Sequence, residues 1–305
     1  MKMVIRADDV GYTHVHNLGT FEAVDSGLVT SCDVMLDTPG TVEALEMLHE
    51  RPWISTGWHT HFWGSPVLDP SKVPSMVDKE TGHFRRDLSR AEDVSYEECM
   101  AEMQAQMELC IKILGRALDT GGMMGGGATP FAKALSDTAK KYGLVSNFAY
   151  HVDFRSLFEK HEFVIADPAE AWKSRKIHMT VEMEGTPTQA VFRSDSIAVQ
   201  KEYDPLRLWT ADDAGLSTLP ADATAVVVLH PGYLDDYVLK DGDPGPRNWQ
   251  YLLTRPMEVR ALCSPILKNW MLEHQIELVN FRDALYGTQE YQNHLRVIGS
   301  DLCML

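Results

Sequence analysis

The chain lacks most of the features that mark a membrane or nucleic-acid-binding protein. No uninterrupted apolar run approaches the ~20 residues of a membrane-spanning helix. Acidic residues outnumber basic ones by 44 to 28, so the basic clusters that bind phosphate backbones are missing. The first residues reach Asp8 too soon for a secretory signal peptide. We therefore expect a cytoplasmic protein without a nucleic-acid or membrane partner.

Two further classes of protein, disulfide-stabilised and nucleotide-binding proteins, are disfavoured because the sequence lacks the cysteine pattern and the glycine motifs that they need. The five cysteines are odd in number and form no CxxC pair, which predicts reduced thiols and not a disulfide framework. The glycine-rich run 121–127 contains no GxxxxGKS/T pattern, and no GxGxxG motif follows a predicted strand, so nucleotide binding is disfavoured. We interpret the run as a loop, or as a place where small residues widen a pocket for a different substrate.

Apolar runs of strand length alternate with helical patterns along most of the chain. Strands are expected near residues 3–7, 29–36, 54–61, 144–150, 225–229 and 276–280, and helix starts near Thr13, Thr38, Ser95, Thr129, Thr254 and Ser264. The alternation predicts right-handed βαβ units and a parallel sheet of about seven strands. The expected fold is α/β, a single distorted (β/α) barrel of the TIM type over residues 1–305, with excursions near 62–93 and 151–221.

Polar side chains follow several of these strands. Asp8 and Asp9 end the first, His59 and His61 end the third, and His230 follows the run 225–229. Asp119 is expected at another strand end. Because parallel strands present their carboxyl ends at one face, where α/β active sites lie, we expect these residues to meet. His59 and His61 are two apart, which predicts that both point to the same side of their strand.

The order of these motifs resembles a known family. Ala7-Asp8-Asp9-Val10-Gly11, Gly57-Trp58-His59, Asp119, His230-Pro231-Gly232-Tyr233 and the tail 255–285 together resemble the YdjC-like carbohydrate deacetylases. The resemblance implies removal of an N-acetyl group from a small amino sugar or oligosaccharide with one divalent metal ion, Mg²⁺ or Zn²⁺. It also implies that Asp8 is the general base, that Asp9 and His59 bind the metal, and that His230 lies beside the reacting group.

The chain departs from the family at the third metal ligand. Where the family has an Asp followed by a His-rich run, this chain reads Asp119-Thr120-Gly121-Gly122-Met123-Met124, and its next histidine is His151. Catalytic divalent sites usually have three protein ligands. His61 is the preferred replacement because of its spacing, and Asp119 and His151 are the alternatives.

Aromatic residues accompany the same strand ends. Trp58, Trp63 and Tyr233 are candidates for stacking on a sugar, with core packing as the alternative. Two other functions stay open, a sugar lyase or isomerase using the same metal and a sugar-binding homologue without activity. A small carbohydrate is the expected partner, and a homodimer is the default assembly.

Overall fold

The computed structural model describes residues 1–122, 129–146, 177–180, 204–212, 216–219, 221–241 and 248–305. Eight strands form one parallel sheet in the order β5-β4-β3-β2-β1-β7-β6, with β8 paired to β1 off this path. They are β1 (Lys2–Val10), β2 (Ser31–Met35), β3 (Ser55–His59), β4 (Thr120–Gly122), β5 (Val145–Ser146), β6 (Ile177–Thr180), β7 (Thr224–Leu229) and β8 (Glu277–Leu278). The predicted α/β class and parallel sheet are confirmed, and the described ladder is curled but has no pairing between β5 and β6.

Strand β1 is the centre of the sheet, and its two edges are used differently. One edge pairs with β7 along Lys2 to Ala7. On the other edge the carbonyls of Met1 and Met3 accept hydrogen bonds from the β8 segment, and the carbonyl of Ile5 accepts one from Thr30 at 2.9 Å. Since alternate carbonyls of a strand point to the same side, β8 lies beside the start of β1 and β2 beside its end.

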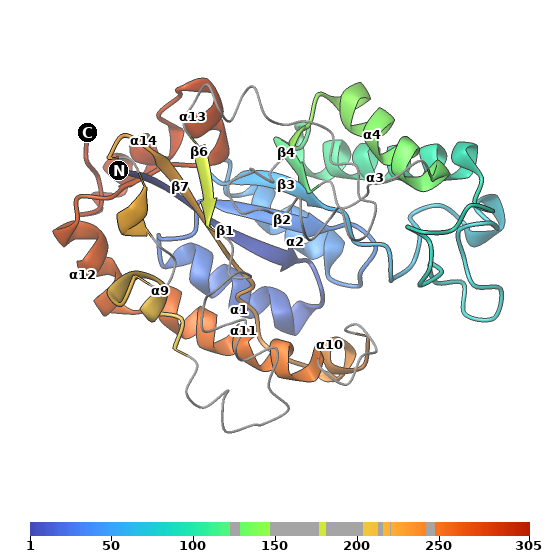
Figure 1. The fold of residues 1–305 in the computed structure, drawn as a ribbon, viewed down its shortest axis with the longest axis horizontal. Helices are drawn as coiled ribbons and strands as arrows, with labels where there is room; N and C mark the ends of the chain where they lie inside the picture. Colours follow the sequence, from blue (N-terminus) through green and yellow to red (C-terminus); the bar gives the residue numbers. More distant parts are fainter. Residues whose placement is uncertain (123–128, 147–176, 181–203, 213–215, 220, 242–247) are drawn as a thin grey trace.

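The helices follow the strands along the chain (Figure 1). They are α1 (His14–Asp25), α2 (Thr41–His49), α3 (Tyr96–Leu114), α4 (Pro130–Tyr142), α9 (Arg207–Thr210), α10 (Asp236–Asp241), α11 (Asn248–Leu262), α12 (Pro265–Glu273), α13 (Phe281–Tyr286) and α14 (Glu290–Val297). Short 3₁₀ turns lie at Pro70–Lys72 and Leu216–Thr218. The predicted caps are confirmed at Thr13, Ser95, Thr129 and Ser264, whose side chains accept hydrogen bonds from first-turn amides.

Several predicted boundaries are wrong. Helix α2 begins at Thr41 with Gly40 as its N-cap, and not at Thr38. The third strand ends at His59 and not at His61. Helix α11 begins at Asn248 and runs through Pro256, whereas the Thr254-Arg255-Pro256 sequence predicted a helix start. Proline is favoured in the first turn of a helix because it has no N–H to donate, so an interior proline gives a misleading start signal.

The excursion at 62–93 is part of the packed structure. Val73, Met76, Phe84 and Leu88 are all buried in the main hydrophobic cluster. Most of the other predicted excursion, 151–221, lies outside the described residues.

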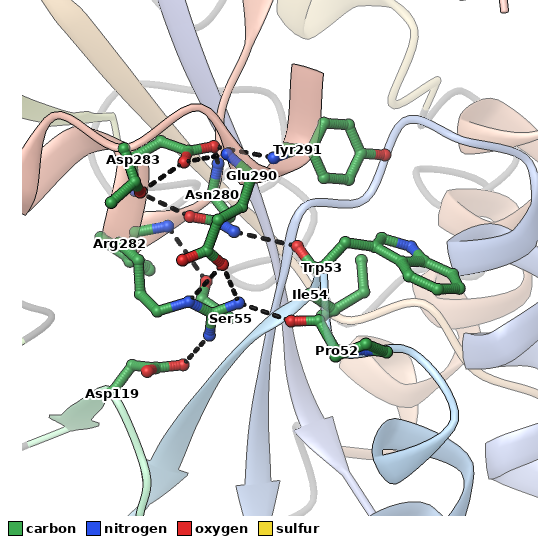
Figure 2. A network of polar contacts seen from close by, with 12 residues as sticks. Pro52, Trp53, Ile54, Ser55, Asp119, Asn280, Arg282, Asp283, Glu290 and Tyr291 are labelled. Atoms are coloured by element: carbon green, nitrogen blue, oxygen red, sulfur yellow. Dashed lines mark hydrogen bonds and ion pairs between the residues drawn. The ribbon is translucent and has the colours of Figure 1, made fainter. Parts of the chain in front are cut away.

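The segment after β8 closes the amino ends of β3 and β4 (Figure 2). Asn280 donates to the carbonyl of Trp53 at 2.9 Å, and the amide of Phe281 donates to Ser55 Oγ at 3.1 Å. Arg282 donates to the carbonyl of Pro52 at 2.6 Å and pairs with Asp119 at 2.5 Å. These contacts bind the last helices to strands more than two hundred residues earlier in the chain.

Asp119 therefore lies at the wrong end of the sheet for the predicted site. It precedes β4, and its carboxylate accepts hydrogen bonds from the Thr56 amide, Arg116 and Arg282. In the ladder Thr120 is level with Gly57, while Gly122 is level with His59 at the carboxyl end. The prediction that Asp119 ends a strand at the site is wrong, because an acidic residue beside a short strand can lie at either end of it.

Asp283 holds this C-terminal segment together and gives a stability prediction. Its carboxylate accepts from Thr288 Oγ1 at 2.7 Å and from the amides of Asn280, Glu290 and Tyr291. We expect Asp283→Ala to lower the free energy of unfolding by about 2–4 kcal/mol, since it removes a capping box and leaves buried donors unpaired. Urea unfolding measures the loss. Asp301→Ala, at an exposed residue of the same segment, should change stability far less. Equal effects of the two substitutions would contradict this account.

Candidate active site

The carboxyl end of β1 carries a bulge that separates Asp8 from Asp9. The pairing with β2 shifts register between Ala7 and Val10, and Asp9 adopts φ 57°. This left-handed conformation is uncommon for any residue except glycine and often accompanies functional sites. The bulge lets the two adjacent carboxylates engage different partners.

Asp8 is held by a buried arginine from its own strand. Arg6 Nε lies 2.7 Å from Asp8 Oδ1, and an Arg6 terminal nitrogen donates to Oδ2 at 2.9 Å. Arg6 Nε also lies 3.6 Å from Asp33 on β2, and its side chain is only 2% exposed. Burial disfavours the guanidinium charge, but Asp8 and Asp33 outweigh burial and raise the pKa of Arg6. Asp8 is thus fixed in orientation by a two-point contact.

Asp9 joins three distant parts of the chain. Its Oδ1 lies 2.9 Å from His59 Nε2 at the end of β3, and its Oδ2 accepts a hydrogen bond from Arg255 on α11. Burial tends to raise the pKa of Asp9, but Arg255 and His59 outweigh it and hold this pKa well below its ordinary value. Burial lowers the pKa of His59, yet Asp9 and Asp8 raise it to about 9. The neighbouring carboxylates therefore favour the protonated, positively charged form of the His59 ring.

His61 lies beyond the strand and turns to a different carboxylate. Its amide donates to the carbonyl of His59 at 2.7 Å, which reverses the chain just after β3. The His61 Nδ1 atom lies 2.8 Å from Asp37 Oδ1, and Asp37 also accepts from the amides of Trp63 and Gly64. The prediction that His59 and His61 share one side of a strand is wrong, because the strand ends between them. His61 Nε2 is buried and has no hydrogen-bond partner among the described residues.

His230 follows β7 in a tightly packed loop. Its backbone amide donates to Glu258 Oε2 at 2.5 Å. Burial outweighs the attraction of Asp9 and Asp8 and lowers the pKa of His230, so its ring is neutral. A Cβ at Gly232 would lie 2.2 Å from His16 Nε2, which explains the glycine of the His-Pro-Gly motif. His230 thus approaches the two aspartates from the strand on the opposite edge of β1.

Three residues at the site have no assigned role from the sequence. They are His16, Arg255 and Glu258, each at most 2% exposed. The one available signal was a pair of charged residues three apart, Arg255 and Glu258, in a helix whose neighbouring positions are buried. His16 carries no such signal, because its place beside Gly232 depends on a contact between α1 and the loop after β7.

The predicted aromatic platforms differ in environment. Trp58 is fully buried, and its Nε1 donates to Gln106 on α3 at 3.2 Å, so it is a core residue and not a stacking platform. Tyr233 donates its hydroxyl to Glu22 on α1 at 2.5 Å. Trp63 is 36% exposed, and its ring lies 4.5 Å from the ring of His61. Among the three, Trp63 has the exposure that a sugar platform needs.

The chemistry of the donor set fits part of a divalent metal site. Asp9 Oδ1 and His59 Nε2 are 2.9 Å apart, which is also the separation of two ligands that lie at right angles and ~2.1 Å from one ion. No group of three His, Cys, Asp or Glu side chains suited to a metal occurs in the described part of the chain. Gly121 and Gly122, level with Trp58 and His59, add no side-chain donor, and His151 lies outside the described residues.

No helix that the structure describes is both long and apolar enough to cross a bilayer.

The chain is similar to curated proteins called carbohydrate deacetylase from Brevibacillus brevis, 27% identical over 93% of this chain and 99% of the relative, and from Listeria monocytogenes, 24% identical over 93% and 100%. A chitooligosaccharide deacetylase from Proteus mirabilis is 23% identical over 93% of this chain and 98% of the relative.

A solved structure from Enterococcus faecalis V583, named as that of a candidate cellobiose-phosphate cleavage protein, shares the fold. Its TM-score is 0.58 with 23% identity, covering 93% of this chain and 98% of the other. The family model for YdjC-like proteins matches residues 2–273 of this sequence. With a match over most of its length and the strand-end residues of the motif in place, the chain belongs to the YdjC-like protein family.

Proposed function

We propose that the protein removes an N-acetyl group from a small amino sugar or oligosaccharide, using one divalent ion, Mg²⁺ or Zn²⁺. The observation that carries the proposal is the meeting of Asp9 and His59 at 2.9 Å, beside the fixed carboxylate of Asp8. The names of the relatives support hydrolysis of a carbohydrate amide. We also expect the curled sheet to form the distorted barrel that the family resemblance implies.

Each residue has a role that its surroundings allow. Asp8 accepts the proton of the attacking water, and Arg6 fixes the direction of its carboxylate. The neutral ring of His230 stabilises the tetrahedral intermediate by a hydrogen bond from its ring N–H, or takes up the proton that Asp8 received from the water and passes it to the departing amine. Trp63 offers an exposed indole ring for the sugar.

Asp9 and His59 would hold the metal. Because no third donor joins them in the described part of the chain, the third ligand would be His61 after a change in the position of its side chain, or His151. The contacts of His61 support its candidacy, because Nδ1 is engaged by Asp37 and Nε2 has no hydrogen-bond partner in the described structure. When bound, a divalent ion polarises the amide carbonyl and lowers the pKa of its water.

The Asp8→Asn protein is expected to release acetate about 10²- to 10⁴-fold more slowly than the parent, because the amide cannot accept the proton. The measurement is kcat for acetate release from N-acetylglucosamine and its short oligomers. Glu50→Gln, an exposed change on the C-terminal side of α2, serves as the control. Undiminished activity of Asp8→Asn would remove Asp8 from the mechanism.

The same panel separates the proposed function from the two alternatives. Glycines replace the family's His-rich run after Asp119, and this departure favours a different reaction, such as that of a lyase or isomerase. The sugar products are therefore followed by NMR along with acetate. Stoichiometric metal with a rearranged or cleaved sugar and no acetate would support a lyase or isomerase. Sugar binding without metal or turnover would support an inactive homologue. Acetate release that stops on chelation and returns with added Mg²⁺ or Zn²⁺ would support the deacetylase.

A further inference from the structure

Helix α11 reaches both sides of the candidate site through two buried charges. Arg255 donates to Asp9 Oδ2, and Glu258, one turn further along, accepts the backbone amide of His230 at 2.5 Å. Arg255 is 2% exposed and Glu258 is fully buried. Residues three apart lie on the same helix face, so one surface of α11 holds the end of β1 and the end of β7.

The N–H groups of Arg255 determine the protonation state of its second neighbour, His16. A guanidinium has only N–H donors, so His16 Nε2, 3.3 Å from Arg255, must accept a hydrogen bond. His16 is then neutral and carries its proton on Nδ1, where it faces Thr20 Oγ1 at 3.4 Å. Burial and Arg255 lower the pKa of His16 to about 3, in agreement with this assignment.

The hydrogen bonds continue into the loop of His230. Thr20 Oγ1 donates to the carbonyl of Pro231 at 2.6 Å. The chain Asp9, Arg255, His16, Thr20 and Pro231 therefore connects the first strand to the His-Pro-Gly loop through α11 and α1. These two helices pack against each other on one side of the sheet (Figure 1).

Asp9 needs such an anchor more than an ordinary strand residue does. Its left-handed backbone conformation is disfavoured for a residue with a side chain and persists only where the surroundings fix it. Arg255 supplies a charged donor to one carboxylate oxygen, which leaves the other oxygen directed at His59. The Tyr12 ring, 5.6 Å from the guanidinium carbon, packs against Arg255.

We propose that Arg255 and Glu258 are positioning residues, which hold Asp9 and the His230 backbone in the relative placement that the reaction requires. The inference rests on the proposed function for the nature of that reaction. Both side chains are buried behind the residues that they hold, so neither needs to contact the substrate.

The test compares Arg255→Met, Arg255→Lys and Glu258→Met with Arg260→Met, an exposed substitution on the same helix. We expect Arg255→Met and Glu258→Met to lower kcat about 10- to 100-fold with little change in KM, while Arg260→Met matches the parent. Arg255→Lys keeps the charge but has a single-point ammonium, so it should recover melting temperature more than kcat. A purely structural role would instead make kcat follow melting temperature across the series.

Two readouts do not depend on turnover. Calorimetric titration with Mg²⁺ or Zn²⁺ alone should show ~10- to 100-fold weaker binding to Arg255→Met than to Arg260→Met. The ring-nitrogen NMR signals of His59, assigned with His59→Gln, should move in Arg255→Met without metal and stay in place in Arg260→Met. Unmoved His59 signals together with parental kcat or parental metal affinity would overturn the positioning role. A parent protein that releases no acetate would instead refute the proposed function, and the NMR comparison would still decide the inference.

Discussion

Asp9→Asn is expected to reduce kcat/KM for acetate release about 10³-fold, an effect comparable to loss of a principal electrostatic group in an active site. Asparagine keeps the shape of the side chain but removes the charge that faces both His59 and Arg255. It also places a donor amide against one of two groups that already donate. The measurement is kcat/KM on the best N-acetylated substrate of the panel, with metal affinity determined in parallel.

Asp25→Asn is the matched control for this substitution. Asp25 lies at the end of α1 and forms an exposed ion pair with Arg51 at 2.7 Å, so its loss should leave activity unchanged. If Asp9→Asn keeps activity within tenfold of the parent while folded, Asp9 is neither a metal ligand nor an essential charge, and the proposed site would have to be abandoned.

Arg6→Met is expected to lower the free energy of unfolding by about 3–5 kcal/mol, because it leaves buried carboxylates without their cation. Arg6 lies between Asp8 and Asp33, whose side chains are 8% and 2% exposed. Methionine has a similar length and cannot neutralise either acid. Chemical denaturation followed by circular dichroism measures the change.

The double variant Arg6→Met/Asp33→Asn tests the cause of that loss. Removing the charge of Asp33 should restore part of the stability, since a neutral amide is less costly to bury than an unpaired carboxylate. Arg90→Met, at an exposed arginine, should have almost no effect. A loss below ~1 kcal/mol for Arg6→Met would mean that the contacts of Arg6 with Asp8 and Asp33 contribute no more to stability than a surface ion pair does.

The alternation of apolar runs was sufficient to predict the parallel α/β sheet and the strand ends that carry Asp8, Asp9, His59 and His230. Periodicity reports which face of an element is buried, and this information is local. His61 was misplaced because the two-residue rule holds only while the strand continues, and the strand ends at His59. Asp119 was misplaced because the sequence does not say at which end of a three-residue strand an acid lies.

Arg255 and His16 show why the rest of the site could not be predicted from the sequence. Their contacts join residues 246 and 239 positions apart, and each depends on how α1 and α11 pack on the sheet. Pro256 also indicated a helix start, which hid the fact that Arg255 and Glu258 occupy one continuous helical face. Buried charges separated by one helical turn are the pattern to look for in related sequences.

The divided edge of β1 has a consequence for biosynthesis. Its first residues pair with β8 on one edge, and Lys2 to Ala7 pair with β7 on the other, so the N-terminal strand obtains its full set of neighbours only after residue 278 has been made. Until then this largely buried strand presents open edges, which are templates for association with other chains. High contact order of this kind slows folding and extends the exposure. Nascent or C-terminally truncated chains of this protein should therefore depend on chaperones to a degree that the finished sheet does not suggest.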